Sequence, residues 1–557
     1  MYIRFHMLKT KDYQADQSKA KNELDLRPSI IAKLQQLVKD GSNGLYVLSM
    51  QTIEPDIATS KVDISNATIK IDSIRMKKLD SLRILPDDIF ELKFPYIHID
   101  GMGIEDLLSS KKVDLKGIFC TKPEVIMYHK KQSYNSAKRE HNDQLSLYEK
   151  LKGNFHSINI GKFKIENGTF IHHNFSNSST NKFNEIGIVL QNILIDSSTQ
   201  NDRNRFLYAD KANIESKNFK YPTPDSLYYL KLGNILLSGD KHNISLTNVE
   251  LIPRFNRIKF EKKLRFRKEM YNILFNKISI KDIDWWAALN LEEIIADEAV
   301  VTGGTINVYI DKTLPSVAAK INNFPQQWIR RIHLPIGLGK LNIDKVNIEY
   351  EEYNPKTRQS AIVYFDKLKA QASNITNITS RINKQPNITL NAQVMFMHKT
   401  KMSGLFLLNQ AKQQTGDFKG DLEMQALDNS TVNPITEPLQ LFTVKRGMMQ
   451  SAHAHVEGNN NTIRGYSTML YNDLHITPLK ADNNSEVRFK KKSMTSLIAN
   501  IFLIKNANPI KGSSVRSPHF QVNRDSKSNL ISFIWSSLVN GLLQSVGIPP
   551  RLAVDHD

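Results

Sequence analysis

The sequence is short of the residues and motifs on which most enzymes depend. Cys120 is the only cysteine, which excludes an intrachain disulfide and a cysteine-rich zinc module. The G-x-S-x-G, H-E-x-x-H, Walker and C-x-x-C motifs are absent, and "GMGIED" at 101–106 lacks the third glycine of a dinucleotide fingerprint. His453 and His455 lie two positions apart, but no third metal ligand is evident nearby. We therefore expect a protein that is not an enzyme, with no catalytic residue, no cofactor and no bound metal.

Long apolar runs are also scarce. Residues 1–23, "MYIRFHMLKTKDYQADQSKAKNE", contain no stretch that resembles a signal peptide or a spanning helix, so neither is expected in this N-terminus. The most apolar helix should cover residues 528–548, although Asn540, Gly541 and Gln544 interrupt it. Three roles are open to this helix: it could lie at a membrane interface, cap the end of a sheet, or span a bilayer.

What the sequence does contain is a recurring strand pattern. Eight segments are apolar at positions 1, 3, 6 and 8 of an eight-residue frame. A regular strand would place the two apolar pairs on opposite faces, whereas one extra residue forming a β-bulge would return both pairs to one face and bend the strand. The frames are "VDISNATI" (62–69), "IHIDGMGI" (97–104), "VDLKGIFC" (113–120), "INIGKFKI" (158–165), "IVLQNILI" (188–195), "ISLTNVEL" (244–251), "ISIKDIDW" (278–285) and "LNIDKVNI" (341–348).

Strands that bend at similar points indicate a sheet that curls. We therefore predict a mainly β fold, namely an elongated, curled, groove-like antiparallel β-sheet with a few short helices at the ends and between repeats. Helices are expected at 27–41, at 428–442 in broken form, at 491–506 and at 528–548. Two alternatives are pairs of short strands joined at a corner and ordinary sandwich strands with both faces covered.

An internal similarity helps to divide the chain. The segment from Ile97 to Tyr128 aligns without a gap on the segment from Ile278 to Tyr309, at a constant offset of 181 and with five identities. This alignment favours a duplicated unit of one strand, a short helix and two further strands. The predicted organisation is an N-terminal segment with a short helix, a repeated β-groove region, a C-terminal β region, and a basic stretch with the C-terminal helices, at 1–43, 44–335 (units around 62–131 and 188–312), 336–485 and 486–557.

The formal net charge of +19 favours anionic partners. Residues 254–268 carry eight Lys or Arg against one Glu, but no nucleic-acid module surrounds them, so a solvated hairpin edge is favoured and nucleic acid is an unlikely partner. Residues 488–504 join a lysine run to an apolar helix, which is typical of a segment on an anionic membrane. The candidate membrane contacts are Lys490, Lys491, Lys492, Ile501, Phe502, Phe533, Trp535, Leu538 and Leu542.

Several stretches resemble the AsmA-like family of Gram-negative, Bacteroidetes-type envelope proteins. The likeness lies in the hydrophobic texture of the strands rather than in a catalytic signature. The stretches are "GLYVLSMQTIEPDIATSKVDISNATIKID" (44–72), "IHIDGMGIEDLLSSKKVDLKGIFCTKPEVIMYHKK" (97–131), "INIGKFKIENGTFIHH" (158–173), "LPIGLGKLNIDKVNIEYEEY" (334–353) and "NPITEPLQLFTVKRGMMQSAHAHVEGNNNTIRGYSTMLYNDLHI" (433–476).

The resemblance implies a bridge-like lipid-transfer protein of the periplasm or cell envelope, associated with the inner membrane and reaching toward the outer one. Its partners would be phospholipid or another envelope lipid, a membrane surface, and envelope proteins at the C-terminal end. About 25 strands spaced about 4.8 Å apart would extend on the order of 120 Å. The candidates for the groove wall are Ile97, Ile99, Ile278, Ile280, Leu341 and Ile343. The alternative, from a different functional class, is a structural or assembly factor whose open sheet edges bind other proteins.

Overall fold

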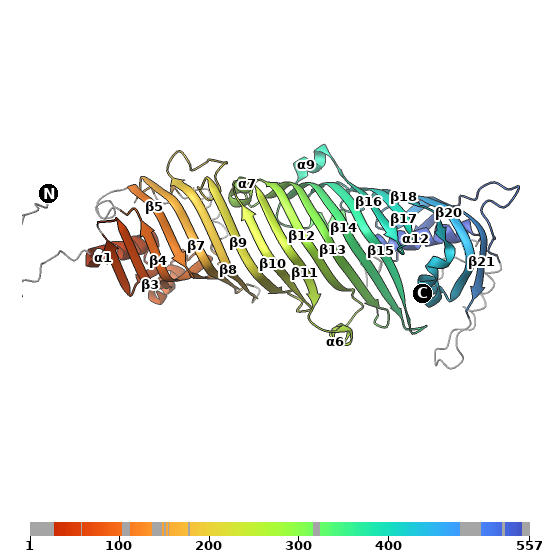
Figure 1. Ribbon diagram of the computed structural model, residues 1–557, viewed down its shortest axis with the longest axis horizontal. Coiled ribbons are helices and arrows are strands. Elements are labelled where there is room, and N and C mark those ends of the chain that lie inside the picture. The colour runs from red at the N-terminus through yellow and green to blue at the C-terminus, as the bar shows by residue number, and fades with distance from the viewer. Residues whose placement is uncertain are drawn as a thin grey trace, which may run out of the picture.

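The strands form one long sheet (Figure 1). The computed structural model describes residues 27–56, 58–102, 112–135, 148–149, 152–153, 155–176, 179–315, 323–479, 503–525 and 530–547. The strands of the N-terminal half are β1 (Tyr46–Ser49), β2 (Thr52–Asp56), β3 (Lys61–Ile71), β4 (Asp88–Asp100), β5 (Lys112–Thr121), β6 (Glu124–His129), β7 (Ser157–Asn174), β8 (Ser179–Ile195), β9 (Lys211–Pro222), β10 (Tyr228–Ser238) and β11 (Asn243–Pro253). The remaining strands are β12 (Met270–Ile283), β13 (Ile294–Asp311), β14 (Ile336–Asn354), β15 (Gln359–Thr376), β16 (Asn387–Phe396), β17 (Thr400–Asn409), β18 (Phe418–Met424), β19 (Leu427–Asp428), β20 (Phe442–Gly458), β21 (Thr462–Pro478) and β22 (His519–Asn523).

The prediction of a mainly β, curled fold is confirmed, with one difference in strand direction. Most neighbours are antiparallel, but β7 pairs in parallel with β5 and β6, and β14 pairs in parallel with β13. A parallel neighbour requires a connection that returns the chain to the same end of the sheet. The long segments between β6 and β7 and between β13 and β14 supply it, so the sheet is mixed. Pairing between β13 and β14 also carries the sheet across the boundary expected at residue 335.

Six of the eight predicted bends coincide with a residue in the left-handed conformation. The fifth residue has a positive φ in six frames, with values from 50° to 78°, at Asn66, Gly101, Asn192, Asn248, Asp282 and Lys345. Asn, Asp and Gly tolerate this conformation better than other residues. A shifted register, the mark of a true bulge, accompanies only the frame of Lys345. At Asn66, Asn192, Asn248 and Asp282 the residue opposite is left out of the pairing as well, so the register continues unchanged. Gly101 lies just beyond the end of β4.

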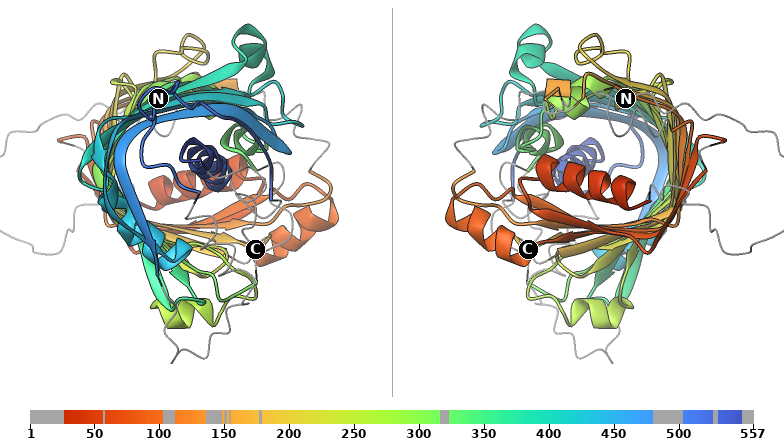
Figure 2. Two further views of the ribbon diagram at one scale, coloured as in Figure 1. Left: turned by 90° about the vertical axis from the view of Figure 1, so that its right-hand side faces the viewer. Right: turned by 90° about the vertical axis from the view of Figure 1, so that its left-hand side faces the viewer.

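Left-handed residues form two lines that cross the strands. The first line contains Asn66, Lys122, Asn167, Glu185, Asn218, Asn248, Gly303, Lys345 and Lys367, which follow one another from β3 to β15. The second contains Gly101, Asn192, Asp282 and Asn374. Along one strand the two lines are about six residues apart, and this double bend accounts for the trough-like cross-section in Figure 2.

Short helices connect the strands and close the ends of the trough. They are α1 (Arg27–Gly41), α2 (Ser73–Ser81), α6 (Arg257–Glu261), α7 (Trp285–Asn290), α8 (Pro325–Arg330), α9 (Thr379–Lys384), the 3₁₀ turn η1 (Asn429–Val432), α10 (Asn433–Gln440) and α12 (Leu530–Ser545). The expected helix at 27–41, the broken helix at 428–442 and the helix at 528–548 are confirmed. Most of the expected helix at 491–506 lies outside the described residues, and residues 503–506 are not helical.

The two segments that align in the sequence also pair their strands in the same way. Ile97 lies opposite Cys120, and Ile278 lies opposite Val301, so both partners keep the offset of 181. In both units the second strand also pairs in parallel with a further strand: β5 pairs with β7, and β13 pairs with β14. The short helix of the first unit would fall at 103–111, outside the described residues.

The helices of the described ranges were compared with the length of a bilayer core. None of them combines the length and the apolar character that a membrane crossing requires.

Candidate functional site

One face of the sheet carries an unbroken line of apolar positions, which we call the apolar row. Each member lies directly opposite the next on the neighbouring strand, and every member is apolar or glycine. From β2 to β22 the row consists of Ile53, Ile64, Ile97, Cys120, Ile165, Ile188, Ile214, Leu237, Ile244, Ile280, Ala299, Leu341, Ala372, Leu390, Phe406, Gly420, Val456, Gly465 and Phe520.

The apolar row faces the inside of the trough. At the N-terminal end, Ile30 of α1 packs in one cluster with Ile53 and Ile64. At the C-terminal end, Phe533 of α12 packs in one cluster with Val456 and other members of the row. Both helices lie within the curve of the sheet in Figure 2, so the side chains that they contact point into the trough.

The opposite face of the same strands is mostly polar. Ser245 lies opposite Ser279, and beyond Val300 of β13 the line continues through Asn342, Gln371 and Asn391. These residues are immediate chain neighbours of members of the apolar row, and successive side chains of a strand point to opposite faces. The sheet therefore separates an apolar inner surface from a mostly polar outer one.

The six residues predicted for the groove wall all point into the trough. Ile280 and Leu341 belong to the apolar row and are joined through Ala299, while Ile278 and Ile343 lie two residues further along the same strands and are joined through Val301. Ile97 and Ile99 lie at the other end, in the cluster that contains Ile30 of α1. The sheet thus brings four of the six together and places the remaining pair beside a helix.

The apolar row is covered unevenly along its length. In the central section, β8 to β12, the side chains of Ile188, Ile214, Leu237, Ile244 and Ile280 are only half-buried. In the C-terminal section, β15 to β22, helices α8, α10 and α12 fill the trough. There the wall becomes a closed core that includes Ala372, Ile388, Leu408, Phe418, Val456, Ile463 and Phe520. The five central side chains pack on one side against Phe206, Trp285 and Ala296, so they are partly covered. Apolar side chains that stay partly exposed along several neighbouring strands are typical of a binding surface.

Sequence reasoning missed most of the central wall. Ile188 and Ile244 open two of the eight frames, so the pattern that identified Ile278 and Leu341 could have identified them as well. Ile214 and Leu237 lie in no frame, and only strand pairing places them between these neighbours.

Cys120 serves the row as a small apolar residue. Its side chain is 4% exposed and lies between Ile97 and Ile165. Burial raises the pKa of the thiol to about 11, which keeps it protonated at neutral pH and makes it a poor nucleophile.

Tyrosines mark one margin of the inner surface. Tyr271 and Tyr350 lie in line on either side of Val308, beyond the first line of bends. Burial raises the pKa of both phenols, that of Tyr271 to about 12. The Tyr350 hydroxyl donates to the Glu352 carboxylate over 2.9 Å, and Lys312 pairs with the same carboxylate. The apolar wall therefore ends in amphipathic side chains, next to the buried Glu352 carboxylate and its partly exposed partner Lys312.

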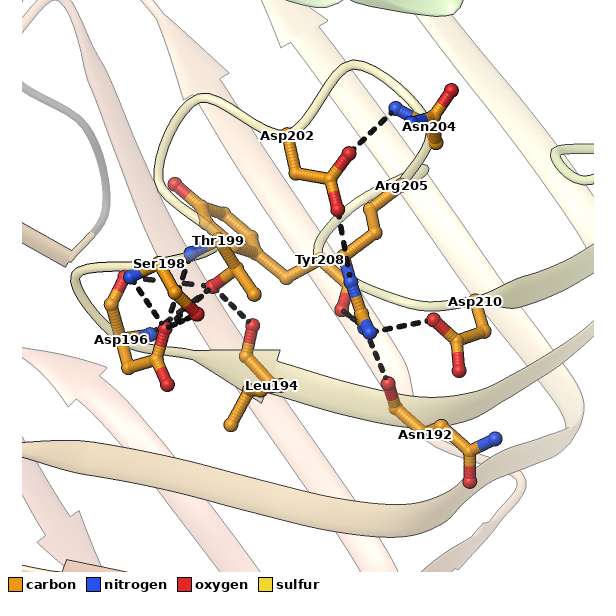
Figure 3. Close-up of polar contacts among 10 residues, drawn as sticks. All are labelled: Asn192, Leu194, Asp196, Ser198, Thr199, Asp202, Asn204, Arg205, Tyr208 and Asp210. Carbon is orange, nitrogen blue, oxygen red and sulfur yellow. Dashed lines mark hydrogen bonds and ion pairs between the residues drawn. The ribbon is translucent and has the colours of Figure 1, made fainter.

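The loop between β8 and β9 closes the opposite margin (Figure 3). Arg205 holds this loop together, because its guanidinium contacts the Asp210 carboxylate at 2.6 Å and donates to the Asn192 carbonyl at 2.8 Å. The loop inserts Phe206 against the ring of Trp285, with centroids 5.1 Å apart. The polar side chains of this loop fix its shape, and they place an aromatic pair over one edge of the trough.

A hollow of about 810 Å³ extends across β7 to β11. Its lining includes Lys164, Glu215 and Ser245, which point to the polar outer face because they adjoin inward-facing isoleucines. Acidic and basic side chains alternate in it, so it does not select a ligand of one charge.

The candidate membrane contacts have different surroundings. Phe533 is 1% exposed and packed inside the trough, so in this conformation it cannot contact a membrane. Trp535 is 38% exposed, whereas Leu538 and Leu542 are half-buried. Lys490, Lys491, Lys492, Ile501 and Phe502 lie outside the described residues.

Helix α12 packs through its small residues. An added Cβ at Gly541 would approach the Phe520 ring and the Ser467 hydroxyl to 2.6 Å each, so only glycine fits there. Ser537 and Ser545 are fully buried on the same side, while Ile531 is 80% exposed. The helix therefore lies close to the strands and turns Ile531 and Trp535 away from them.

The described residues contain no group of three side chains suited to a metal ion. His455 contacts the Asp421 carboxylate at 2.6 Å, and His453 lies against the Tyr466 ring. Neither a known protein-family model nor a curated protein matches the sequence.

Proposed function

We propose that the protein is a non-enzymatic lipid-binding protein, whose inner surface holds acyl chains in the central section and conducts them along the apolar row. The observation that carries this proposal is the central part of the row, where four half-buried isoleucines and Leu237, packed on one side against Phe206 and Trp285, continue the line that α12 covers elsewhere. An acyl chain would cover them as α12 covers Val456 and Phe520.

The free energy of burying methylene groups is compatible with a lipid that moves along the apolar row. Burial of each methylene group contributes roughly 0.8 kcal/mol, so several methylenes on the wall suffice for stable binding. Successive strands present similar apolar side chains at a spacing of about 4.8 Å, so a lipid can advance with little change in free energy. Charged headgroups would remain at the open side of the trough, because burying an unpaired charge is costly.

The trough is shorter than 25 strands would make it. Several strands share one position along its length, for example β5 and β6, which both pair with β7. The nineteen members of the apolar row, spaced about 4.8 Å apart, give a length on the order of 90 Å. This length and the strand texture support the resemblance to AsmA-like proteins, and with it a place in the periplasm or cell envelope, where the trough would bridge membranes.

The test is to purify the protein from its native host and identify bound molecules by mass spectrometry. We expect about one or more phospholipids per chain, and their loss in the double variant Ile244→Asp/Ile280→Asp. The matched control is Ser245→Asp/Ser279→Asp, which adds the same charges to the outer face of the same two strands. Lipid-free protein that retains a tightly held polypeptide would overturn the proposal and favour the structural or assembly role.

A further inference from the structure

A basic projection leaves one long edge of the trough. It comprises residues 254–268, between β11 and β12, and includes α6 (Figure 1). In the end-on views α6 lies outside the curve of the sheet, away from α1 and α12 (Figure 2). The segment contains eight Lys or Arg and one Glu. Its position on the edge separates it from the apolar row inside the trough.

The base of the projection is firmly anchored. Phe260 is 1% exposed and packs edge-on against Tyr228, with centroids 5.6 Å apart. The Arg257 guanidinium donates two hydrogen bonds to the Glu351 carboxylate, of 3.0 and 2.6 Å. Arg267 donates to two backbone carbonyls of the loop after β13, and Lys268 pairs with Asp225 at 2.7 Å. The projection is therefore a built feature of the edge rather than a loose hairpin tip.

The one acidic side chain of the segment is turned inward. Glu261 lies with Tyr309 and Asp311 in a small cavity beneath α6, where burial and the neighbouring Asp311 raise the pKa of its carboxyl group. The outer surface is therefore cationic: Lys259, Lys262, Lys263 and Arg265 are all exposed.

Two large apolar side chains stand among these cations. Ile258 is 65% exposed and Phe266 is 48% exposed. Exposed apolar side chains next to a cluster of Lys and Arg are the combination with which peripheral proteins enter the interface of an anionic bilayer. Arg254 and Lys263 lie over the ring of Phe255, so Phe266 is the one exposed aromatic ring of the segment. Its exposed partner Ile258 is aliphatic and cannot stack on a nucleic-acid base, which favours a lipid surface over nucleic acid.

We infer that the α6 projection docks the long edge of the trough on an anionic phospholipid membrane, with Ile258 and Phe266 in the acyl boundary and the surrounding cations at the headgroups. This inference goes beyond the proposed function, because it concerns the outer edge and holds whether or not the trough carries lipid. A docked edge would set the trough along the membrane surface at this point.

The test is flotation of the full chain with vesicles of phosphatidylcholine, alone or mixed with phosphatidylglycerol. We expect binding only to the mixed vesicles and a decrease with added salt. The variant Lys259→Glu/Lys262→Glu/Arg265→Glu should weaken this binding about tenfold or more. The control Lys384→Glu/Lys399→Glu/Lys401→Glu makes the same change of net charge at other exposed positions and should bind nearly as the parent does.

A second variant separates insertion from simple attraction. Ile258→Ser/Phe266→Ser leaves every charge in place and should also lower vesicle binding severalfold. Equal losses in the two triple variants would reduce the effect to net charge and overturn the inference. Binding of single-stranded RNA that depends on the α6 cations, without vesicle binding, would also overturn it. Lipid bound within the trough should be the same in all these variants, so failure here is distinct from failure of the proposed function.

Discussion

The central and C-terminal sections of the trough share one apolar row but cover it differently. In the central section, Ile244 and Ile280 remain half-buried on the wall, whereas in the C-terminal section Val456 is completely buried beneath α12. The strands continue from one section to the other in unbroken pairing. The same strand pattern therefore builds a closed core where α12 lies on it, and a partly exposed wall where only α7 and the β8–β9 loop pack against one side.

The largest contrast is expected from one charge placed in each section. Val456→Asp should lower the free energy of unfolding by about 4 kcal/mol or more, because it buries an unpaired carboxylate. Ile280→Asp should cost less than half as much, because solvent can reach its position. Denaturant titration followed by fluorescence measures both. Equal losses of stability would break the comparison, since they would mean that the central wall is also a closed core.

Two side chains of α12 sharpen the comparison within one helix. Phe533→Ala should cost about 3–5 kcal/mol, because it leaves a cavity in the core of the C-terminal section. Trp535→Ala should change stability by less than about 1 kcal/mol, because this side chain is partly exposed and points away from the buried side of the helix. Thermal unfolding of the two variants distinguishes them, and the reverse order would show that α12 packs through its other face.

Substitutions at the bends should change the free energy of unfolding by less. Lys345 adopts a φ of 57° and Asn248 a φ of 50°. Lys345→Gly should stabilise the protein by about 1 kcal/mol, because glycine adopts this conformation without strain. Asn248→Ala should destabilise it by a similar amount. Denaturation midpoints test both, and stabilisation by Asn248→Ala would contradict the role of the left-handed residue.

The smallest effect concerns Cys120 and its pKa of about 11. In the folded state the raised pKa favours the protonated thiol. Its contribution to stability is therefore present below the pKa of the unfolded chain and is lost as the pH rises toward 11. Alkylation by iodoacetamide at pH 8 should be slow in the native protein and fast after denaturation. Rapid native labelling would show that the N-terminal part of the row is open.

Local sequence was a good guide wherever a short segment decides its own conformation. Pro28 near the start and Gly41 at the end bound α1 as predicted, because these residues act through their own backbone. The polar centres of the frames pointed to the bends for the same reason. The parallel pairing of β13 with β14 could not be predicted in this way, because it depends on a long connection rather than on either strand.

The residues of the candidate site also differ in whether the sequence or the tertiary structure decided their position. The sequence by itself determined that Ile278 shares a face with Ile280, and Leu341 with Ile343, since side chains alternate along a strand. The register through β13 decided that the two pairs lie on the same face of the sheet. Only the tertiary structure decided that this face lines the inside of a trough and joins Ile214 and Leu237 into one row. It also decided that α12 buries Val456 completely, whereas Ile244 stays half-buried beside the cluster of Phe206 and Trp285. Strand order and helix placement arise from contacts between distant segments, and no local pattern encodes them.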